Sequence, residues 1–102
     1  MQNVNLECTI YYDVLERECF AVMDELRIES GLYAGTVFVV VMDRFGGHEM
    51  VHESHMKAGN VKIEKFTCYD AHQIRRVLLE LSFVNDLKTK KQFVQSYQLL
   101  NF

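Results

Sequence analysis

The longest apolar run of the chain covers residues 36–42 and consists mainly of β-branched and aromatic residues. Seven residues of this kind favour a strand over a helix, because branched and aromatic side chains fit a pleated surface. The run has no polar face, so it predicts a strand that is buried on both sides. We therefore expect a central strand here, with other elements covering it.

Turn residues divide the chain after this run into segments of similar length. Gly46 and Gly47 indicate a hairpin, because glycine adopts positive φ at little cost. A second turn at Gly59 and Asn60 leads into a strand-like run over residues 61–69. The sequence therefore predicts an antiparallel meander of three strands. A helix over residues 48–56 is the alternative for the middle segment.

The first third of the chain shows two different periods. Apolar and polar residues alternate over residues 4–12, which predicts a strand with one buried face. Asp13 and Glu16 then match a helix-capping pair, and apolar residues recur at helical spacing until Gly31. We therefore expect a helix over residues 14–29. Its apolar positions are Leu15, Cys19, Val22, Met23 and Leu26.

The last third predicts a helix that begins after Asp70. Asp70 stands at the N-cap position and Gln73 at the third helical position, and an apolar stripe continues to about residue 84. Residues 87–102 permit a helix or a strand, and the residues that begin this segment favour a helix. Asp86 would cap such a helix, unless the preceding helix continues to residue 88.

These elements give the order β-α-β-β-β-α, followed by a C-terminal helix or strand. The expected fold class is α+β, a two-layer sandwich in which helices cover one face of an antiparallel sheet. At 102 residues, the chain is expected to form a single domain over residues 1–102. With 49% hydrophobic and 25% charged residues, its composition is that of an ordered globular protein rather than a disordered one.

The sequence shows no signal for export or for membrane insertion. Its apolar runs are shorter than the roughly 18 residues that a membrane span needs, and its N-terminus lacks the pattern of a signal peptide. We therefore expect a cytoplasmic protein. Cys8, Cys19 and Cys68 are widely spaced within apolar patterns, which favours reduced thiols in the core over disulfides or a metal site.

Charge is distributed unevenly along the chain. Residues 1–35 carry seven acidic and two basic residues, whereas residues 70–102 carry three acidic and five basic residues. The basic residues are too few, in a chain with a pI near 5.7, for the surface of a nucleic-acid-binding protein. Direct nucleic-acid binding is therefore not expected. The acidic side of the predicted first helix is either a solvated surface or a docking surface.

One motif carries a possible chemistry. Residues 48–52 read His-Glu-Met-Val-His and match H-E-x-x-H, so the segment resembles the zinc-binding helix of zincin metalloproteases. That resemblance implies zinc on His48 and His52, with His55 as a third ligand and Glu49 as the general base. The flanking turns favour a strand instead, on which Glu49 and His55 point away from the other two histidines.

The function expected from these observations is protein binding without catalysis or a cofactor. The module would occupy or mask a partner surface as an inhibitor or an adaptor. Small domains often have such a role, including those of phages and mobile elements. Its partner would be a protein with a basic surface, such as one that handles nucleic acid. The alternatives are a zinc-binding or zinc-dependent hydrolytic protein and a module that self-associates, for example as a homodimer, through a sheet edge. The expected partner-binding residues are Glu18, Asp24, Glu25 and Glu29.

Overall fold

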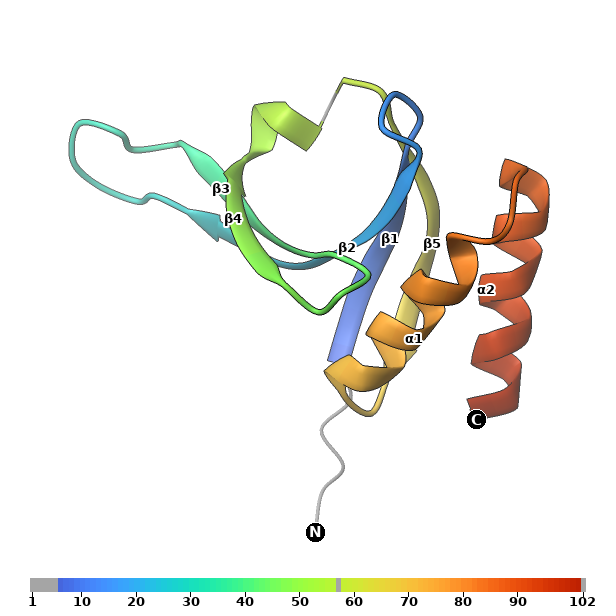
Figure 1. Cartoon of the computed structure of the whole chain (residues 1–102). Helices are drawn as coiled ribbons and strands as arrows, with labels where there is room; N and C mark the ends of the chain where they lie inside the picture. Colours follow the sequence, from blue (N-terminus) through green and yellow to red (C-terminus); the bar gives the residue numbers. More distant parts are fainter. Residues whose placement is uncertain (1–5, 57, 102) are drawn as a thin grey trace, which may run out of the picture.

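The computed structural model describes residues 6–56 and 58–101, in which five strands form one antiparallel sheet with two helices beside it (Figure 1). The α+β class is therefore confirmed. The order of the strands across the sheet is β4-β3-β2-β1-β5. The expected meander is therefore wrong for its third strand, because β5 pairs with β1 at the opposite edge and not with β4. The elements are β1 (Leu6–Asp13), β2 (Glu18–Arg27), β3 (Val37–Met42), β4 (His48–His52), the single 3-10 turn η1 (Glu53–Met56), β5 (Asn60–Cys68), α1 (Ala71–Leu81) and α2 (Leu87–Asn101).

The expected helix over residues 14–29 is wrong, because this segment forms a hairpin turn and strand β2. Asp13 Oδ1 accepts hydrogen bonds from the backbone N–H groups of Leu15 at 2.9 Å and Glu16 at 3.1 Å. Arg17 adopts φ of 59°, a left-handed conformation that turns the chain back along β1. Asp13 thus satisfies backbone donors as a helix N-cap would, but it does so in a turn between two strands.

A β-bulge explains why β2 looks helical in sequence. The register between β2 and β3 shifts between Val22 and Asp24, so that one extra residue lies in β2. Cys19 and Ala21 are buried, but beyond the bulge the alternation of inner and outer residues changes phase. The resulting spacing of apolar residues is closer to a helical period than to a strand period.

The apolar run at residues 36–42 forms β3, but β3 is neither central nor fully covered. It lies second from one edge of the sheet, and β2 is the middle strand. Val37 and Val39 are buried, whereas Phe38 and Val40 on the other face are only half-buried. The expectation of burial on both faces is therefore wrong for the face that carries Phe38 and Val40.

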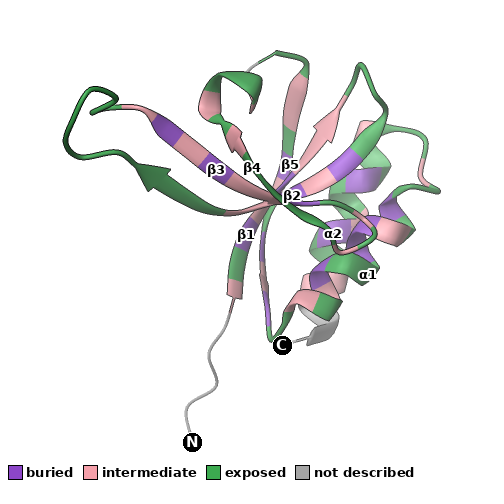
Figure 2. Cartoon of the chain, turned by 60° about the vertical axis from the view of Figure 1, so that its left-hand side comes forward, coloured by how far each residue is buried: buried purple, intermediate pink, exposed green. Residues whose placement is uncertain are grey.

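Both helices pack on one face of the sheet, over the half that contains β1, β5 and the start of β2 (Figures 1 and 2). The core between the layers includes Ile10 and Phe66 from the sheet and Val94 from α2. Residues spaced three to four apart on α1 supply the rest of this layer, as its apolar stripe predicts. They are Ile74, Val77, Leu78 and Leu81.

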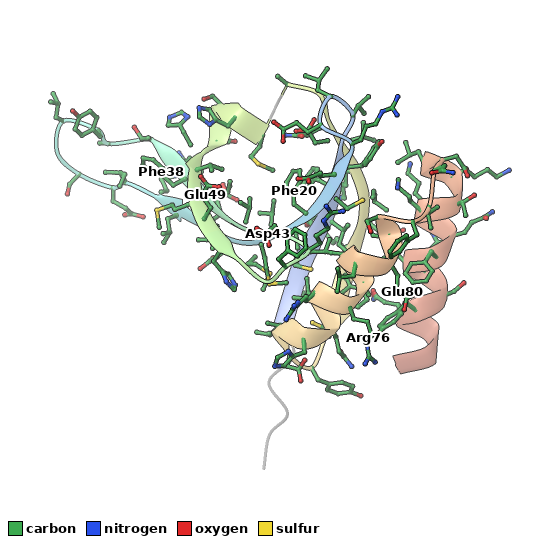
Figure 3. The ribbon with its side chains drawn as sticks, in the orientation of Figure 1. Phe20, Phe38, Asp43, Glu49, Arg76 and Glu80 are labelled. Carbon is green, nitrogen blue, oxygen red and sulfur yellow. The ribbon has the colours of Figure 1, made fainter. Side chains whose placement is uncertain are left out.

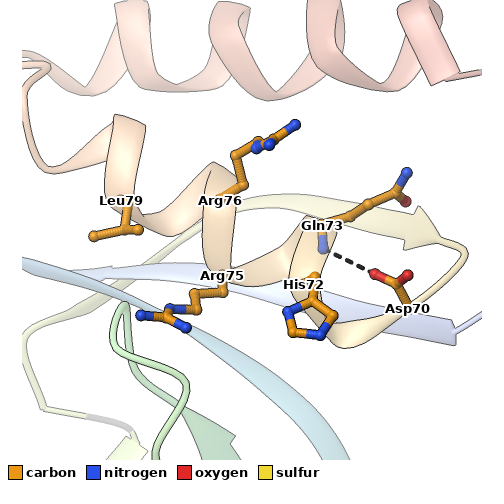
Figure 4. A pocket seen from close by; sticks show the side chains of 6 residues that line it. All are labelled: Asp70, His72, Gln73, Arg75, Arg76 and Leu79. Atoms are coloured by element: carbon orange, nitrogen blue, oxygen red, sulfur yellow. Dashed lines mark hydrogen bonds between the residues drawn. The ribbon is translucent and has the colours of Figure 1, made fainter.

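The caps of both helices agree with the sequence. Asp70 Oδ1 accepts a hydrogen bond from Gln73 N at 3.1 Å (Figure 4), and Gln73 Oε1 accepts one from Tyr69 N at 2.9 Å. Asp86 Oδ2 likewise accepts from Thr89 N at 2.9 Å. The expected helix from residue 87 is therefore confirmed, and α1 ends a few residues before the expected position.

A buried lysine joins the two helices. Lys90 is 3% exposed, and its Nζ donates hydrogen bonds to the carbonyl oxygens of Leu81, at 2.9 Å, and Val84. The same Nζ lies 4.8 Å from the centre of the Tyr12 ring. Lys90 thus satisfies carbonyl groups at the end of α1 from the following helix. In the described part of the chain, neither helix is long and apolar enough to cross a membrane.

Candidate protein-binding surface

Strands β2 and β3 extend beyond the helices as a hairpin arm, seen at the left of Figure 1. Past the paired residues Arg27 and Val37, the arm is closed by hydrogen bonds from Ile28 N to Thr36 O at 2.9 Å and from Gly35 N to Ile28 O at 2.7 Å. Backbone pairing therefore continues up to the loop at its tip, which makes the arm a structured part of the fold.

The tip of the arm presents two large apolar side chains to solvent. Leu32 is 90% exposed and Tyr33 is 70% exposed. They lie between Gly31 and Gly35, which both have φ of 89°, a conformation that residues with a side chain rarely adopt. The glycines therefore fix a turn that holds Leu32 and Tyr33 away from the rest of the molecule.

The apolar surface continues from the tip onto the sheet. Leu26 lies opposite Phe38, and Phe38 lies opposite His52, so these three side chains share one face of the sheet. The Phe38 and His52 rings meet edge to face with centroids 5.6 Å apart. Val40 and Met50 form the next pair on this face. We call the exposed or half-buried apolar residues of this region the arm surface: Leu26, Ile28, Leu32, Tyr33, Phe38 and Met50.

The arm surface lies on the same face of the sheet as the helices, but the helices do not cover it. Met42 belongs to the core beneath the helices, and Val40 and Phe38 follow at alternate positions along the same strand. Figure 2 shows the outer part of β2 and the loop at the arm tip as exposed, whereas β3 alternates between buried and half-buried positions. An open hollow of about 670 Å³ lies here, lined mainly by Ile28, Leu32, Tyr33, Phe38 and His52.

The four acidic residues expected to bind a partner are all exposed, but they do not form one face. Asp24 pairs with Val40 and lies on the face of the arm surface, whereas Glu25 pairs with Val39 and lies on the opposite face. Glu29 lies beyond the end of β2, near the arm tip. Glu18 lies at the other end of β2, 3.9 Å from Arg44. The shared helix face that we expected for them does not exist.

The opposite face of the sheet contains a second open hollow, of about 600 Å³, with an acidic lining. Figure 3 shows Glu49, Asp43 and Phe20 in the bend between β4 and the β1–β2 hairpin. Asp43 Oδ1 accepts hydrogen bonds from the N–H groups of Phe45 and Gly47, both at 2.9 Å, so this carboxylate stabilises the β3–β4 turn. The hollow provides negative charge, but part of that charge has a structural role.

The H-E-x-x-H segment forms strand β4, so the helix alternative for residues 48–56 is wrong. His48 and His52 share a face of β4, and Glu49 lies on the other face. His52 Nδ1 lies 2.8 Å from Ser54 Oγ and accepts a hydrogen bond from Ser54 N at 3.1 Å. His55 belongs to η1 and lines the acidic hollow. Among the described residues, no group of three His, Cys, Asp or Glu side chains is placed to hold a metal ion.

A third hollow, of about 360 Å³, lies beside the start of α1 (Figure 4). Its lining includes His72, Arg75 and Arg76, but the two guanidinium groups point in different directions. The Arg75 side chain packs near Gly46, at the β3–β4 turn. Asp70 caps the helix at this place. Arg75 therefore connects α1 to the β3–β4 turn. Because the guanidinium groups of Arg75 and Arg76 diverge, the hollow lacks the concentrated positive charge that an anion site needs.

The sequence did carry a signal for the arm surface. Residues 32–35 look like a short connection, but Leu32 and Tyr33 are large apolar residues between two glycines, a combination that places them at an exposed turn. Known protein families, curated proteins and solved structures provide no match to the chain.

Proposed function

We propose that the chain is a protein-binding module that contacts its partner through the arm surface and acts by masking the partner, as an inhibitor or an adaptor. One observation supports this most directly: Leu32 and Tyr33 are held in solvent at the end of a structured arm. Grouped exposed apolar side chains are unfavourable in water and typically mark interaction surfaces.

The arm surface contains a residue type that binding hot spots favour. Tyrosine is enriched among the residues that contribute most of the affinity of protein interfaces, because it buries a large area with few rotatable bonds. Leucine is less common in hot spots and contributes through the apolar area that it buries. Burial of a leucine side chain such as Leu32 contributes about 1.5–3 kcal/mol. A partner that covers Leu32, Tyr33 and the neighbouring Phe38 would therefore gain substantial affinity from a few residues.

Charges on the arm favour a basic partner. Asp24, Glu25 and Glu29 outnumber the single basic residue Arg27 in this part of the chain. Negative charge around an apolar contact accelerates association with a positively charged surface. We therefore propose a partner with basic residues around an apolar centre, as in a protein that handles nucleic acid or another polyanion. Cytoplasmic action is part of this proposal, because Cys8, Cys19 and Cys68 are free thiols.

The proposal is tested with a double variant, Leu32→Ser with Tyr33→Ser. Proteins captured from a lysate by equal amounts of wild type and variant are quantified by mass spectrometry. Phe83→Ser is the matched control, because Phe83 is also highly exposed but lies between the helices, away from the arm. We expect at least one protein to be captured by wild type and control and to be lost with the double variant.

Both variants are expected to fold, because the substituted side chains are exposed and exposed substitutions change stability little. Circular dichroism and thermal unfolding check this. If the double variant captures the same proteins in the same amounts as wild type, the arm surface is not the binding site and the proposal is wrong.

A further inference from the structure

The two edge strands of the sheet differ in whether another part of the chain covers them. Helix α2 packs along β5. From α2, Gln98 Oε1 accepts a hydrogen bond from Thr67 N at 3.4 Å, and Gln95 Nε2 donates one to Glu64 at 3.0 Å. At the opposite edge, β4 pairs only with β3 among the described strands. One edge is therefore covered and the other is open.

Three residues of β4 direct their backbone groups toward the open edge. At the β3–β4 turn, Asp43 N donates to Gly47 O at 3.0 Å, which identifies this position as a hydrogen-bonded pair. Such pairs alternate along an antiparallel ladder, and β3 and β4 pair without a register shift. The N–H and C=O groups of His48, Met50 and His52 therefore point away from β3.

The open edge has few of the features that prevent strand addition. Edge strands are commonly protected by short length, charged residues, proline or a bulge. Strand β4 contains no lysine, proline or bulge; it has five residues, which are mostly exposed, and one carboxylate, Glu49. Met50 is 55% exposed at its centre. We therefore infer that the outward backbone groups of β4 are available to a second strand.

We propose that β4 pairs antiparallel with β4 of a second copy, about a two-fold axis through Met50. In this register His48 lies opposite the partner's His52, Met50 lies opposite the partner's Met50, and Glu49 lies opposite the partner's Val51. The three outward residues of each copy then form about six backbone hydrogen bonds across the interface. The two Met50 side chains pack together on the face that carries both arm surfaces.

Charge selects this register over its neighbours. An axis through Glu49 places Glu49 opposite the partner's Glu49, and an axis through Val51 places Glu49 opposite the partner's Glu53. Like charges directly opposite one another are destabilising in a sheet. The register centred on Met50 avoids both pairs, so the segment His-Glu-Met-Val-His is complementary to itself in this register.

The covered β5 edge limits the assembly to two copies. Pairing of β4 with β4 uses the same edge on both molecules and leaves no open strand edge for a third copy. A head-to-tail assembly would need β5, whose edge is bridged by α2. Of the arm-surface residues, Met50 lies on β4 and is covered in this dimer, whereas Leu32 and Tyr33 at the arm tip lie outside the paired strands. The dimer therefore does not use the two residues on which the proposed binding function mainly rests.

Sedimentation of the full chain tests the proposal. Wild type is expected to shift from monomer to dimer somewhere between about 1 µM and 1 mM, the range of a weak interface. Met50→Lys and Met50→Glu each place like charges at the axis and should each weaken dimerisation about ten-fold or more. An equimolar mixture of the two should restore a dimer that contains one copy of each.

A backbone variant and a control complete the test. Met50→Pro removes the outward N–H but no hydrogen bond to β3, and proline is tolerated on edge strands, so it should remain folded and monomeric. Phe83→Ser should dimerise like wild type. The proposal is wrong if wild type stays monomeric throughout, if Met50→Lys dimerises as strongly as wild type, or if species larger than dimers form. If the proline variant fails to fold, the lysine and glutamate variants decide the outcome.

Discussion

The buried thiols of Cys8 and Cys68 are expected to make the folded protein less stable at alkaline pH. Burial raises the pKa of Cys8 to about 12 and that of Cys68 to about 11, above the value of about 8.5 for an exposed thiol. The folded state thus favours the protonated thiols. Their contribution is complete below the unfolded pKa and is lost as pH rises toward the folded values.

We therefore expect the denaturant midpoint to fall between pH 8 and pH 10.5. Lysine and tyrosine residues titrate in the same range, so the decisive comparison is with Cys8→Ala, which removes the more strongly shifted thiol. This variant should show a smaller fall over the same range. An equal fall in wild type and variant would mean that the Cys8 thiol is not protected from ionisation by the fold.

Lys90 is a second residue whose burial has a measurable consequence. Lys90→Met keeps most of the side-chain volume but removes the lysine donor to the carbonyl oxygens of Leu81 and Val84. The Leu81 oxygen keeps its hydrogen bond from Val84 N at 3.1 Å, so the Val84 oxygen is the group that loses its partner. We expect a loss of about 1–3 kcal/mol in the free energy of unfolding, the cost of leaving such a carbonyl group unpaired. Urea denaturation measures it. The same change at the exposed Lys88 should have little effect, and equal losses at both sites would refute the capping role.

At the level of elements, the β1–β2 turn distinguishes the observed hairpin from the helix that the sequence suggested. Arg17 has φ of 59°, which costs a residue with a side chain about 1–2 kcal/mol. Arg17→Gly should therefore leave stability unchanged or raise it by up to about 1 kcal/mol, whereas in a helix it would lower stability by about 1 kcal/mol. Thermal unfolding measures the sign. Glu16→Gly, at a turn position without positive φ, should be destabilising and serves as the control.

Most elements could be predicted because their local signals agree with their tertiary environment. Asp70 and Gln73 cap α1 as their spacing indicates, and Gly46 and Gly59 mark turns that the structure contains. The segment after Asp13 was mispredicted because two local features imitate a helix. An aspartate side chain binds backbone N–H groups equally in a turn or at an N-cap. The bulge after Val22 then removes the alternation that would have revealed the strand.

At the level of the whole molecule, the carboxylates of the arm and its apolar side chains are expected to affect different steps of partner binding. If a partner binds as we propose, neutralising Asp24, Glu25 and Glu29 to their amides should slow association about ten-fold and reduce its dependence on salt. The Leu32→Ser and Tyr33→Ser variant should instead accelerate dissociation. Surface plasmon resonance with the identified partner separates the two rates. Unchanged association of the amide variant would show that these carboxylates are only solvated.

The binding surface was harder to predict than the fold because it depends on what the helices leave uncovered. Phe38 and Val40 look like core residues in sequence, and Met42 in the same strand does belong to the core. Only the three-dimensional arrangement shows that the helix layer ends before it reaches Phe38. The acidic residues were correctly expected to be exposed, but strand geometry distributes Asp24 and Glu25 onto opposite faces.

The position of α2 at the edge of β5 also has a consequence during translation. The ribosome releases all five strands before either helix, and Gln98, which bonds to Thr67, emerges 30 residues after Cys68. At ordinary elongation rates this interval lasts roughly 2–6 s. A sheet that forms during this interval has two open edges and an uncovered apolar face. Polysomes bring such nascent chains close together, so the order of synthesis makes this interval the one in which wrong pairing between copies is most favoured.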